Sequence, residues 1–251
     1  MMFQENPTEI ESILLAVVHI KTYRPDGTST NATGFYFTRN DTLFLITNRH
    51  VVLDEPSGHV PTRIEIGLHP DPTNLAVTSR YSISLYDANG NRTWREAHDT
   101  SGSVDVVSIP ILREYFPNDV LYRSFTPAHL PVEMRDIEVG HSVRVVGFPL
   151  GFHDTLHNLP VMRHAIVASS FSLRFQGNGY FLTDSLLHRG SSGSPVVAYR
   201  KEIGNGRVGF PWYLLGVHSA RLSAASRDPQ QDERLNLFAA WYADVLLTLT
   251  N

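Results

Sequence analysis

The sequence predicts an all-β protein built in two halves. Many short segments rich in branched and aromatic residues are separated by turn signals, which is typical of β-sandwiches and barrels rather than of a parallel α/β sheet. A proline-rich segment without clean periodicity, 113–133, divides these segments into two groups. A chain of 251 residues is long enough to bury a substantial core in one large domain or two small ones.

The first group of expected strands is punctuated by clear turn signals. An apolar run ends at the Arg-Pro-Asp-Gly sequence of residues 24–27, and Asn40 and Asp41 mark a second turn. The Asn-Gly pair within 87–91 predicts a hairpin between the strands on either side of it. The expected strands of this half are 13–23, 34–38, 43–47, 63–68, 81–86, 92–97 and 104–111.

The second group repeats this pattern and ends differently. Its expected strands are 142–147, 161–169, 179–183, 194–199, 212–218 and 235–241. The last residues, 242–249, contain good helix formers and predict a short closing helix.

Composition excludes several classes of function. The net charge of −4 and the lack of a dense Lys/Arg run argue against a partner that is nucleic acid or an anionic membrane. The chain has no cysteine, so disulfides, a thiol nucleophile and cysteine-based metal sites are ruled out. The apolar run 13–20 is too short to span a bilayer and follows glutamates rather than a basic region. We therefore expect a cytoplasmic protein, or a secreted or periplasmic one if a leader has been trimmed.

One stretch points to chemistry, Arg189–Val197 with the sequence RGSSGSPVV. Glycines on both sides of Ser192 allow a tight turn and close approach to the main chain. Such a turn can expose a serine hydroxyl beside converging backbone N–H groups, as a nucleophile next to an oxyanion hole requires. Taken alone, the stretch fits an ordinary Gly/Ser-rich surface turn equally well.

A serine nucleophile needs a base, and the base needs an orienting carboxylate. Among twelve histidines, His50 stands at the end of an apolar strand, in LFLITNRHVV, where its side chain can face a cleft. Asp105 leads into the apolar run DVVSIPI, where a carboxylate is costly unless it is paired. The alternatives are a hydrogen-bonded core histidine and an aspartate that caps a turn.

These three motifs occur in the order His, Asp, Ser and resemble those of trypsin-like serine proteases with the chymotrypsin fold. ITNRHVV, DVVSIPI and GSSGSP are similar to the family's histidine, aspartate and serine motifs. VGFPLG at 146–151 and LLGVHSA at 214–220 resemble segments of the bacterial HtrA-like and V8-like (glutamyl endopeptidase) branches.

The resemblance spans nearly the whole chain and implies a definite architecture. It implies two six-stranded antiparallel β-barrels, 10–115 and 136–251, joined by a linker at 116–135 and followed by a short C-terminal helix. Because the two barrels take up the 251 residues, we expect no PDZ domain of the kind that HtrA-like proteins usually append.

The resemblance also implies roles for individual residues in a serine endopeptidase. Ser192 would attack the scissile carbonyl, His50 would be the general base, and Asp105 would orient its imidazole. The backbone N–H groups of Gly190 and Ser192 would form the oxyanion hole. Digestive-type members place an aspartate just before the serine to pair with a new N-terminus; here Ser191 stands there, so no such zymogen switch is expected.

The expected specificity pocket is mixed in character. His218 matches the histidine with which V8-like and picornaviral 3C proteases read Glu or Gln, yet an aliphatic residue replaces their threonine five positions before the serine. The residue before the cut is therefore expected to be Glu or Gln or a medium apolar residue. The expected pocket residues are Leu186, Leu187, His218, Ser219, Ala220 and Arg221.

No cofactor is expected; His153 and His157 have metal-ligand spacing only on a helix, and their context reads as a loop, so no metal is expected either. Protein or peptide substrates are the expected partners, and the oligomeric state is left open. The alternative to an active protease is a catalytically silent or latent binding or sensor module on the same fold.

Overall fold

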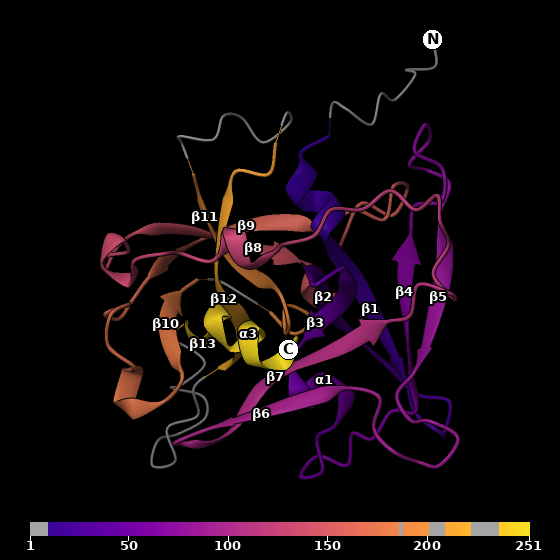
Figure 1. Ribbon diagram of the computed structural model, residues 1–251, viewed down its shortest axis with the longest axis horizontal. Coiled ribbons are helices and arrows are strands. Elements are labelled where there is room, and N and C mark those ends of the chain that lie inside the picture. The colour runs from indigo at the N-terminus through magenta and orange to yellow at the C-terminus, as the bar shows by residue number, and fades with distance from the viewer. Residues whose placement is uncertain (1–9, 186–187, 201–208, 222–235) are drawn as a thin grey trace.

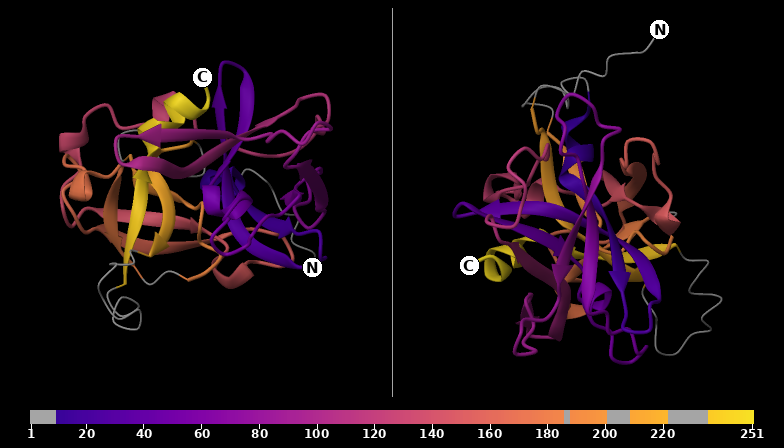
Figure 2. Two further views of the ribbon diagram at one scale, coloured as in Figure 1. Left: turned by 90° about the horizontal axis from the view of Figure 1, so that it is seen from below. Right: turned by 90° about the vertical axis from the view of Figure 1, so that its right-hand side faces the viewer.

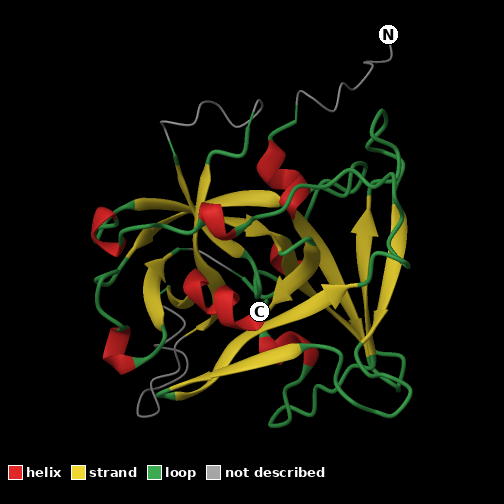
Figure 3. Cartoon of the chain, in the orientation of Figure 1, coloured by secondary structure: helices red, strands yellow, loops and turns green. Residues whose placement is uncertain are grey.

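A computed structural model describes residues 10–185, 188–200, 209–221 and 236–251 and shows two β structures side by side. In Figure 1 the first, coloured indigo to magenta, lies to the right, and the second, coloured orange to yellow, lies to the left. Helices in the described ranges are short and lie between strands or at their ends (Figure 3). None of these helices combines the length and the apolar character needed to cross a membrane.

The first half forms one antiparallel sheet of seven strands in the order β5-β4-β1-β2-β3-β7-β6. The strands are β1 (Val17–Tyr23), β2 (Ser29–Arg39), β3 (Thr42–Thr47), β4 (Arg63–Leu68), β5 (Ser79–Ser84), β6 (Arg95–Asp99) and β7 (Gly102–Ile111). The one-turn helix α1 (Arg49–Val52) follows β3. The 3₁₀ helix η2 (Ser12–Ala16) precedes β1, so the first strand begins four residues later than the sequence predicts.

The second half is a closed barrel of six antiparallel strands in the order β10-β13-β12-β11-β8-β9. Its strands are β8 (Ser142–Gly147), β9 (Val161–Val167), β10 (Tyr180–Asp184), β11 (Pro195–Tyr199), β12 (Trp212–Arg221) and β13 (Leu237–Tyr242). The predicted closing helix is present as η8 (Ala243–Val245) and α3 (Leu246–Leu249), and Leu246 and Leu249 are buried.

Alternation along the strands separates a buried from a polar face. In β1, Val18 and Ile20 pack with Ile64 and Ile66 of β4 in a core under the first sheet. A second core fills the barrel, and a third lies between the two halves, where Phe35 joins residues of both. Burial of each such aromatic side chain contributes about 1.5–3 kcal/mol, which holds the halves together. The two side views in Figure 2 show how closely the halves adjoin.

The connection between the halves contains no strand between β7 and β8 in the described residues. It carries two 3₁₀ turns, η3 (Pro127–His129) and η4 (Met134–Asp136). Phe125 is fully buried, and it pairs with Phe37 in an isolated parallel bridge. The connection is therefore anchored to the first sheet at this point. The predicted boundaries 10–115, 116–135 and 136–251 stay a prediction.

The all-β class is confirmed, but two details of the first half differ from the expectation. The sheet has seven strands rather than six. The turn at Asp87 forms as predicted, with the Gly90 N–H donating to the Asp87 carbonyl oxygen. Its flanks meet over a short stretch, at the antiparallel bridge Tyr86–Arg92 and through the Thr93 N–H, which donates to the Leu85 carbonyl oxygen at 3.1 Å. The hairpin predicted from Asn-Gly is therefore present but short, since beyond it β5 pairs with β4 and β6 pairs with β7.

Candidate active site

His50 lies on the short helix α1, directly after β3. Asn48 adopts an extended conformation that ends the strand, and Val51 and Val52 are buried beneath the helix. The sequence predicted that His50 stands at the end of a strand; in the structure it lies on one turn of helix after that strand. The buried side chains of Val51 and Val52 anchor this helix, while 34% of the His50 side chain stays exposed.

Asp105, the fourth residue of β7, pairs with His50 through both carboxylate oxygens. Nδ1 of His50 lies 2.7 Å from Oδ2 of Asp105, and the His50 backbone N–H donates to Oδ1 at 2.9 Å. The hydroxyl of Ser219, on β12, donates to Oδ2 at 2.5 Å. Because an ionised carboxylate offers several acceptor sites, it can hold all three donors at once.

Asn48 fixes the strand that carries this carboxylate. Its Nδ2 donates to the backbone carbonyl oxygen of Asp105 at 2.7 Å, and its side chain is fully buried. The start of α1 and the middle of β7 are thereby tied together beside the His50–Asp105 pair.

The pairing changes the acid–base behaviour of the histidine. Burial acts to lower the pKa of His50, but the hydrogen bond and the charge of Asp105, with a smaller effect from Asp54, outweigh burial and raise it. A histidine with a raised pKa is a stronger base when neutral. The Nδ1 contact also leaves Nε2 as the ring nitrogen that can accept a proton.

The segment around Ser192 forms a tight loop between β2 and β12. The Thr33 N–H donates to the Ser192 carbonyl oxygen at 2.9 Å, and the Gly193 N–H donates to the His218 carbonyl oxygen at 2.9 Å. Gly193 has φ +85°, and a Cβ there would lie 2.1 Å from the Thr33 carbonyl oxygen. The loop therefore has no room for a side chain at this position.

Gly190 is restricted in the same way, on the other side of the serine. Its φ is +90°, and a Cβ would lie 2.6 Å from the Phe148 carbonyl oxygen. Its own carbonyl oxygen accepts from Oγ1 of Thr33 at 2.7 Å, while the carbonyl oxygen of Arg189 accepts from the Leu150 N–H. Within the part of the chain that the structure describes, the N–H groups of Gly190 and Ser192 donate to no protein acceptor.

The expected specificity pocket is only partly described. His218 is 2% exposed, its ring packs on Phe238, and its Nδ1 is buried and finds no hydrogen-bond partner among the described residues. Burial, followed by the nearby His50, lowers the pKa of His218 to about 3, so its imidazole is neutral. Leu186 and Leu187 lie outside the described residues, and so do the side chains of Ala220 and Arg221, which belong to β12.

Ser219 makes a contact that the sequence did not predict. It is buried, and its hydroxyl is directed to Asp105. Sequence reasoning missed this contact and also missed Thr33 and Asn48. The one signal in the sequence was that these polar residues stand within apolar runs, which indicates burial. The sequence does not show which distant group forms the hydrogen bond that a buried polar side chain needs.

The other sequence candidate, His153 with Asp154 and His157, lies on the loop after η5 (Pro149–Gly151), not on a helix. Nδ1 of His157 bonds to Oδ2 of Asp154, and Nδ1 of His153 bonds to the Gly151 carbonyl oxygen. Across the described ranges, histidine and carboxylate side chains nowhere gather in groups of three that could hold a metal.

A family model supplies the decisive comparison. The model described as the trypsin-like peptidase domain matches residues 32–203, more than half of the chain. The chain belongs to this family. It is accordingly a hydrolase of the serine endopeptidase class, and its substrates are proteins or peptides. Among curated protein sequences, none matches this chain.

Solved structures agree on the fold of this trypsin-like peptidase. An inactive serine-to-alanine mutant of Rv3671c from M. tuberculosis aligns with a TM-score of 0.52 and 16% identity, over 98% of this chain and 90% of that one. The MamO protease domain from Magnetospirillum magneticum aligns with a TM-score of 0.52 and 14% identity, over 94% of this chain and 96% of that one. A serine endoprotease from Yersinia pestis aligns with a TM-score of 0.50 and 13% identity, over 100% of this chain and 66% of that one. At these identities the likeness concerns the fold alone.

Proposed function

We propose that this trypsin-like peptidase cuts peptide bonds with Ser192 as nucleophile, His50 as general base and Asp105 as the residue that orients the base. One observation carries the proposal: the His50–Asp105 hydrogen bond of 2.7 Å, which holds the imidazole in one tautomer and leaves its Nε2 to accept a proton. The chemistry is that of the well-studied serine triad, and the roles follow from it.

In the proposed reaction, Oγ of Ser192 attacks the scissile carbonyl carbon while Nε2 of His50 accepts its proton. Asp105 retains its charge and stabilises the imidazolium that forms. The imidazolium then gives the proton to the leaving amine, the carbon–nitrogen bond breaks, and an acyl-enzyme remains. Water, deprotonated by His50, attacks the ester and restores Ser192.

The N–H groups of Gly190 and Ser192 are proposed to bind the developing oxyanion. Support comes from their lack of an acceptor within the described residues and from the anchoring of the adjacent Arg189 carbonyl by Leu150. Each donor of this kind is worth roughly 10²–10³ in kcat.

We further propose that no N-terminal amine switches this loop on. The residue before the nucleophile is Ser191, which is buried and uncharged. A buried aspartate there would need a cationic partner, whereas a serine does not.

The residue before the cut is proposed to be Gln, Glu or a medium apolar residue. The low pKa of His218 supports Gln over Glu, because a neutral imidazole can hydrogen-bond an amide but carries no charge to offset a buried carboxylate. Profiling a peptide library for that residue is the direct test, and a strong preference for Lys or Arg would contradict this assignment.

A fluorophosphonate probe tests the nucleophile. The wild-type protein should be labelled, Ser192→Ala should not, and the neighbouring Ser191→Ala should retain labelling. If the wild-type protein is not labelled, the catalytically silent binding module becomes the better description of the chain.

A further inference from the structure

A polar cavity of about 320 Å³ lies outside the proposed catalytic residues, between the first sheet and the loop that follows η5. Strands β1, β2, β4 and β5 form one wall, with Lys21, Asn31 and Arg80 among the lining residues. His153 and Asn158 contribute from the loop. A cavity of this size is at the lower end of the range for ligand sites.

The strand register explains why this wall is polar. Lys21 is paired with Asn31 on one side and with Glu65 on the other, so the three side chains share one face of the sheet. The alternate residues of β1, Val18 and Ile20, point into the core beneath. The polar residues therefore lie on the opposite face of the sheet from this core, and residues of the loop border the cavity.

The charges on this face leave a positive excess. Arg63 and Arg80 both lie within ion-pair distance of Glu65, at 3.6 and 3.3 Å, so two cations share one carboxylate. Lys21 makes a cation–π contact with Tyr23, but within the described part of the chain it pairs with no carboxylate.

His19 reports the same positive potential. Burial, together with the charges of His153, Lys21 and Arg80, lowers the pKa of His19 to about 4, against the hydrogen bond to Asn31, which raises it. That hydrogen bond, from Nε2 of His19 to Oδ1 of Asn31, is 3.0 Å long. It occupies the oxygen of Asn31 and leaves its Nδ2 as a donor.

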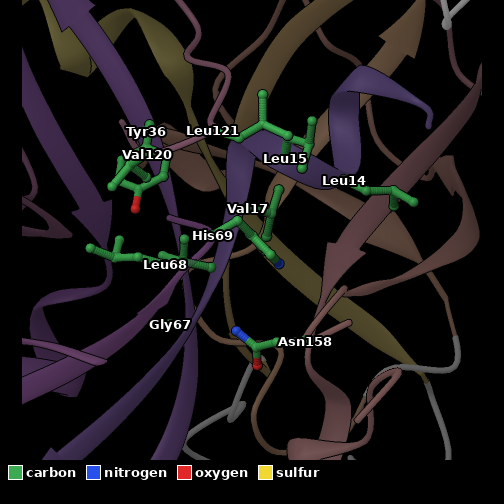
Figure 4. A pocket seen from close by; sticks show the side chains of 11 residues that line it. Leu14, Leu15, Val17, Tyr36, Gly67, Leu68, His69, Val120, Leu121 and Asn158 are labelled. Atoms are coloured by element: carbon green, nitrogen blue, oxygen red, sulfur yellow. The ribbon is translucent and has the colours of Figure 1, made fainter. Parts of the chain in front are cut away.

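Asn158 adds a second amide donor, and its side chain occupies space that a glycine leaves free. A Cβ at position 67 would lie 2.0 Å from Nδ2 of Asn158, so Gly67 makes the space for this side chain. Figure 4 shows Asn158 directed toward Gly67, at the edge of a smaller adjoining cavity. That smaller cavity, about 10 Å³, has room for about one water molecule and no ligand.

The position of the larger cavity relates it to the nucleophile loop. Ser192 lies between β12, which carries His218, and β2, whose Thr33 holds the Ser192 carbonyl. If the side chain before the cut is read at β12, the peptide after the cut leaves on the β2 side. Asn31 is two residues from Thr33, about 7 Å along the strand. An extended peptide reaches that distance about two to four residues after the cut.

We propose that this cavity binds an acidic side chain of the substrate, located about two to four residues after the scissile bond. The proposal rests on the proposed function for its placement along the substrate. Lys21, Asn31 and Asn158 supply the charge and the N–H donors that a carboxylate requires.

Peptides that differ only by Glu or Gln at these positions test the proposal, all with amidated C-termini. The wild-type enzyme should cleave the Glu peptide with a kcat/KM about fivefold higher, as expected for a partly exposed charge pair. Lys21→Gln should abolish this preference, so that the two peptides are cleaved with equal kcat/KM. Arg113→Gln, which removes an exposed charge that does not line the cavity, should keep the preference.

Equal cleavage of both peptides by the wild-type enzyme, or an unchanged preference in Lys21→Gln, would overturn the proposal. A Gln peptide with a free C-terminal carboxylate at the same distance forms a further arm. If this free-carboxylate peptide is preferred and the Glu peptide is not, the cavity binds the C-terminal carboxylate of a peptide, and the assignment to an acidic side chain is wrong.

Binding to Ser192→Ala, measured by fluorescence anisotropy with the same peptides, separates this proposal from the proposed function. If no peptide is cleaved, the proposed function fails, and tighter binding of the Glu peptide still supports the cavity. If peptides are cleaved but Glu and Gln peptides bind Ser192→Ala equally, the cavity assignment alone fails.

Discussion

The hydroxyl of Ser219 on β12 donates a 2.5 Å hydrogen bond to Oδ2 of Asp105 on β7. The contact joins the barrel to the seven-stranded sheet, and it meets the same oxygen that holds Nδ1 of His50. The orientation of the proposed base therefore depends on how the two halves of the molecule are packed.

Ser219→Ala should lower kcat/KM by about tenfold, because a hydrogen bond to a charged group is worth about 1.5–3 kcal/mol and only part of it affects the base. Steady-state kinetics on a neutral peptide measures the effect. Ser84→Ala, at an exposed serine whose hydroxyl donates to the Tyr86 carbonyl oxygen, should leave the rate unchanged. A rate for Ser219→Ala equal to that of the wild-type enzyme would show that Asp105 is held without this contact.

Activity should depend on pH through His50. Its pKa is raised, so the ring loses its proton only above its ordinary value of 6.5, and kcat/KM should rise through a midpoint above that pH. The stability contributed by the His50–Asp105 pair has the opposite sign: it is fully present below pH 6.5 and is lost as pH rises through the folded-state pKa.

Asp105→Asn should reduce kcat by about four orders of magnitude, because an amide favours the wrong tautomer of the imidazole. The wild-type protein and Asp105→Asn are compared in two measurements. The pH–rate profile gives the midpoint of activity, and chemical denaturation at several pH values gives the stability that the His50–Asp105 pair contributes. An activity midpoint below pH 6.5 in the wild-type enzyme would contradict the raised pKa.

Acid should destabilise the fold through His19. Its folded pKa is about 4, below its ordinary value, so the unfolded chain binds the extra proton first. The free energy of unfolding should decline as pH falls from about 6.5 toward 4. His19→Gln should lose less stability over that window in urea titrations, whereas His164→Gln, at an exposed strand position, should behave like the wild-type protein. Identical pH dependence in all three would rule out His19 as the cause.

Thr33→Val should loosen the serine loop without changing the volume of the side chain much. Oγ1 of Thr33 donates to the Gly190 carbonyl at 2.7 Å and accepts from the Phe148 N–H at 3.0 Å, and valine leaves both backbone groups unpaired. We expect a loss of about 1–3 kcal/mol of stability and at least a tenfold fall in kcat. Thr33→Ser should restore kcat, since it keeps the hydroxyl; failure of that rescue would exclude the hydrogen bonds as the reason.

Gly190→Ala should cost more in activity than Thr33→Val. A methyl group at φ +90° would meet the Phe148 carbonyl oxygen at 2.6 Å, so the loop must move and carry its N–H group with it. The expected fall in kcat is roughly 10²-fold or greater, with a smaller change in KM. Gly177→Ala, at a positive φ but with open space around its Cβ, controls for backbone strain alone.

Local sequence predicted most strands, because alternation and turn residues act over a few neighbours. β4 and β8 have the predicted bounds, 63–68 and 142–147. It did not predict the main partners of the strands beyond the turn of Asp87, β4 for β5 and β7 for β6, because that choice depends on distant segments. The motifs around His50, Asp105 and Ser192 also predicted the family, and the structure brings His50 and Asp105 into hydrogen-bond contact.

Residue types and their spacing along the chain thus determined the all-β class, the two groups of strands and the peptidase family. The tertiary structure alone decided that Ser219 faces Asp105, that Thr33 holds the serine loop, and that Lys21 lies beside a cavity closed by a loop of the other half. Each of these contacts joins residues far apart in the sequence. Their polar groups are satisfied by partners that only the packing of the two halves can supply.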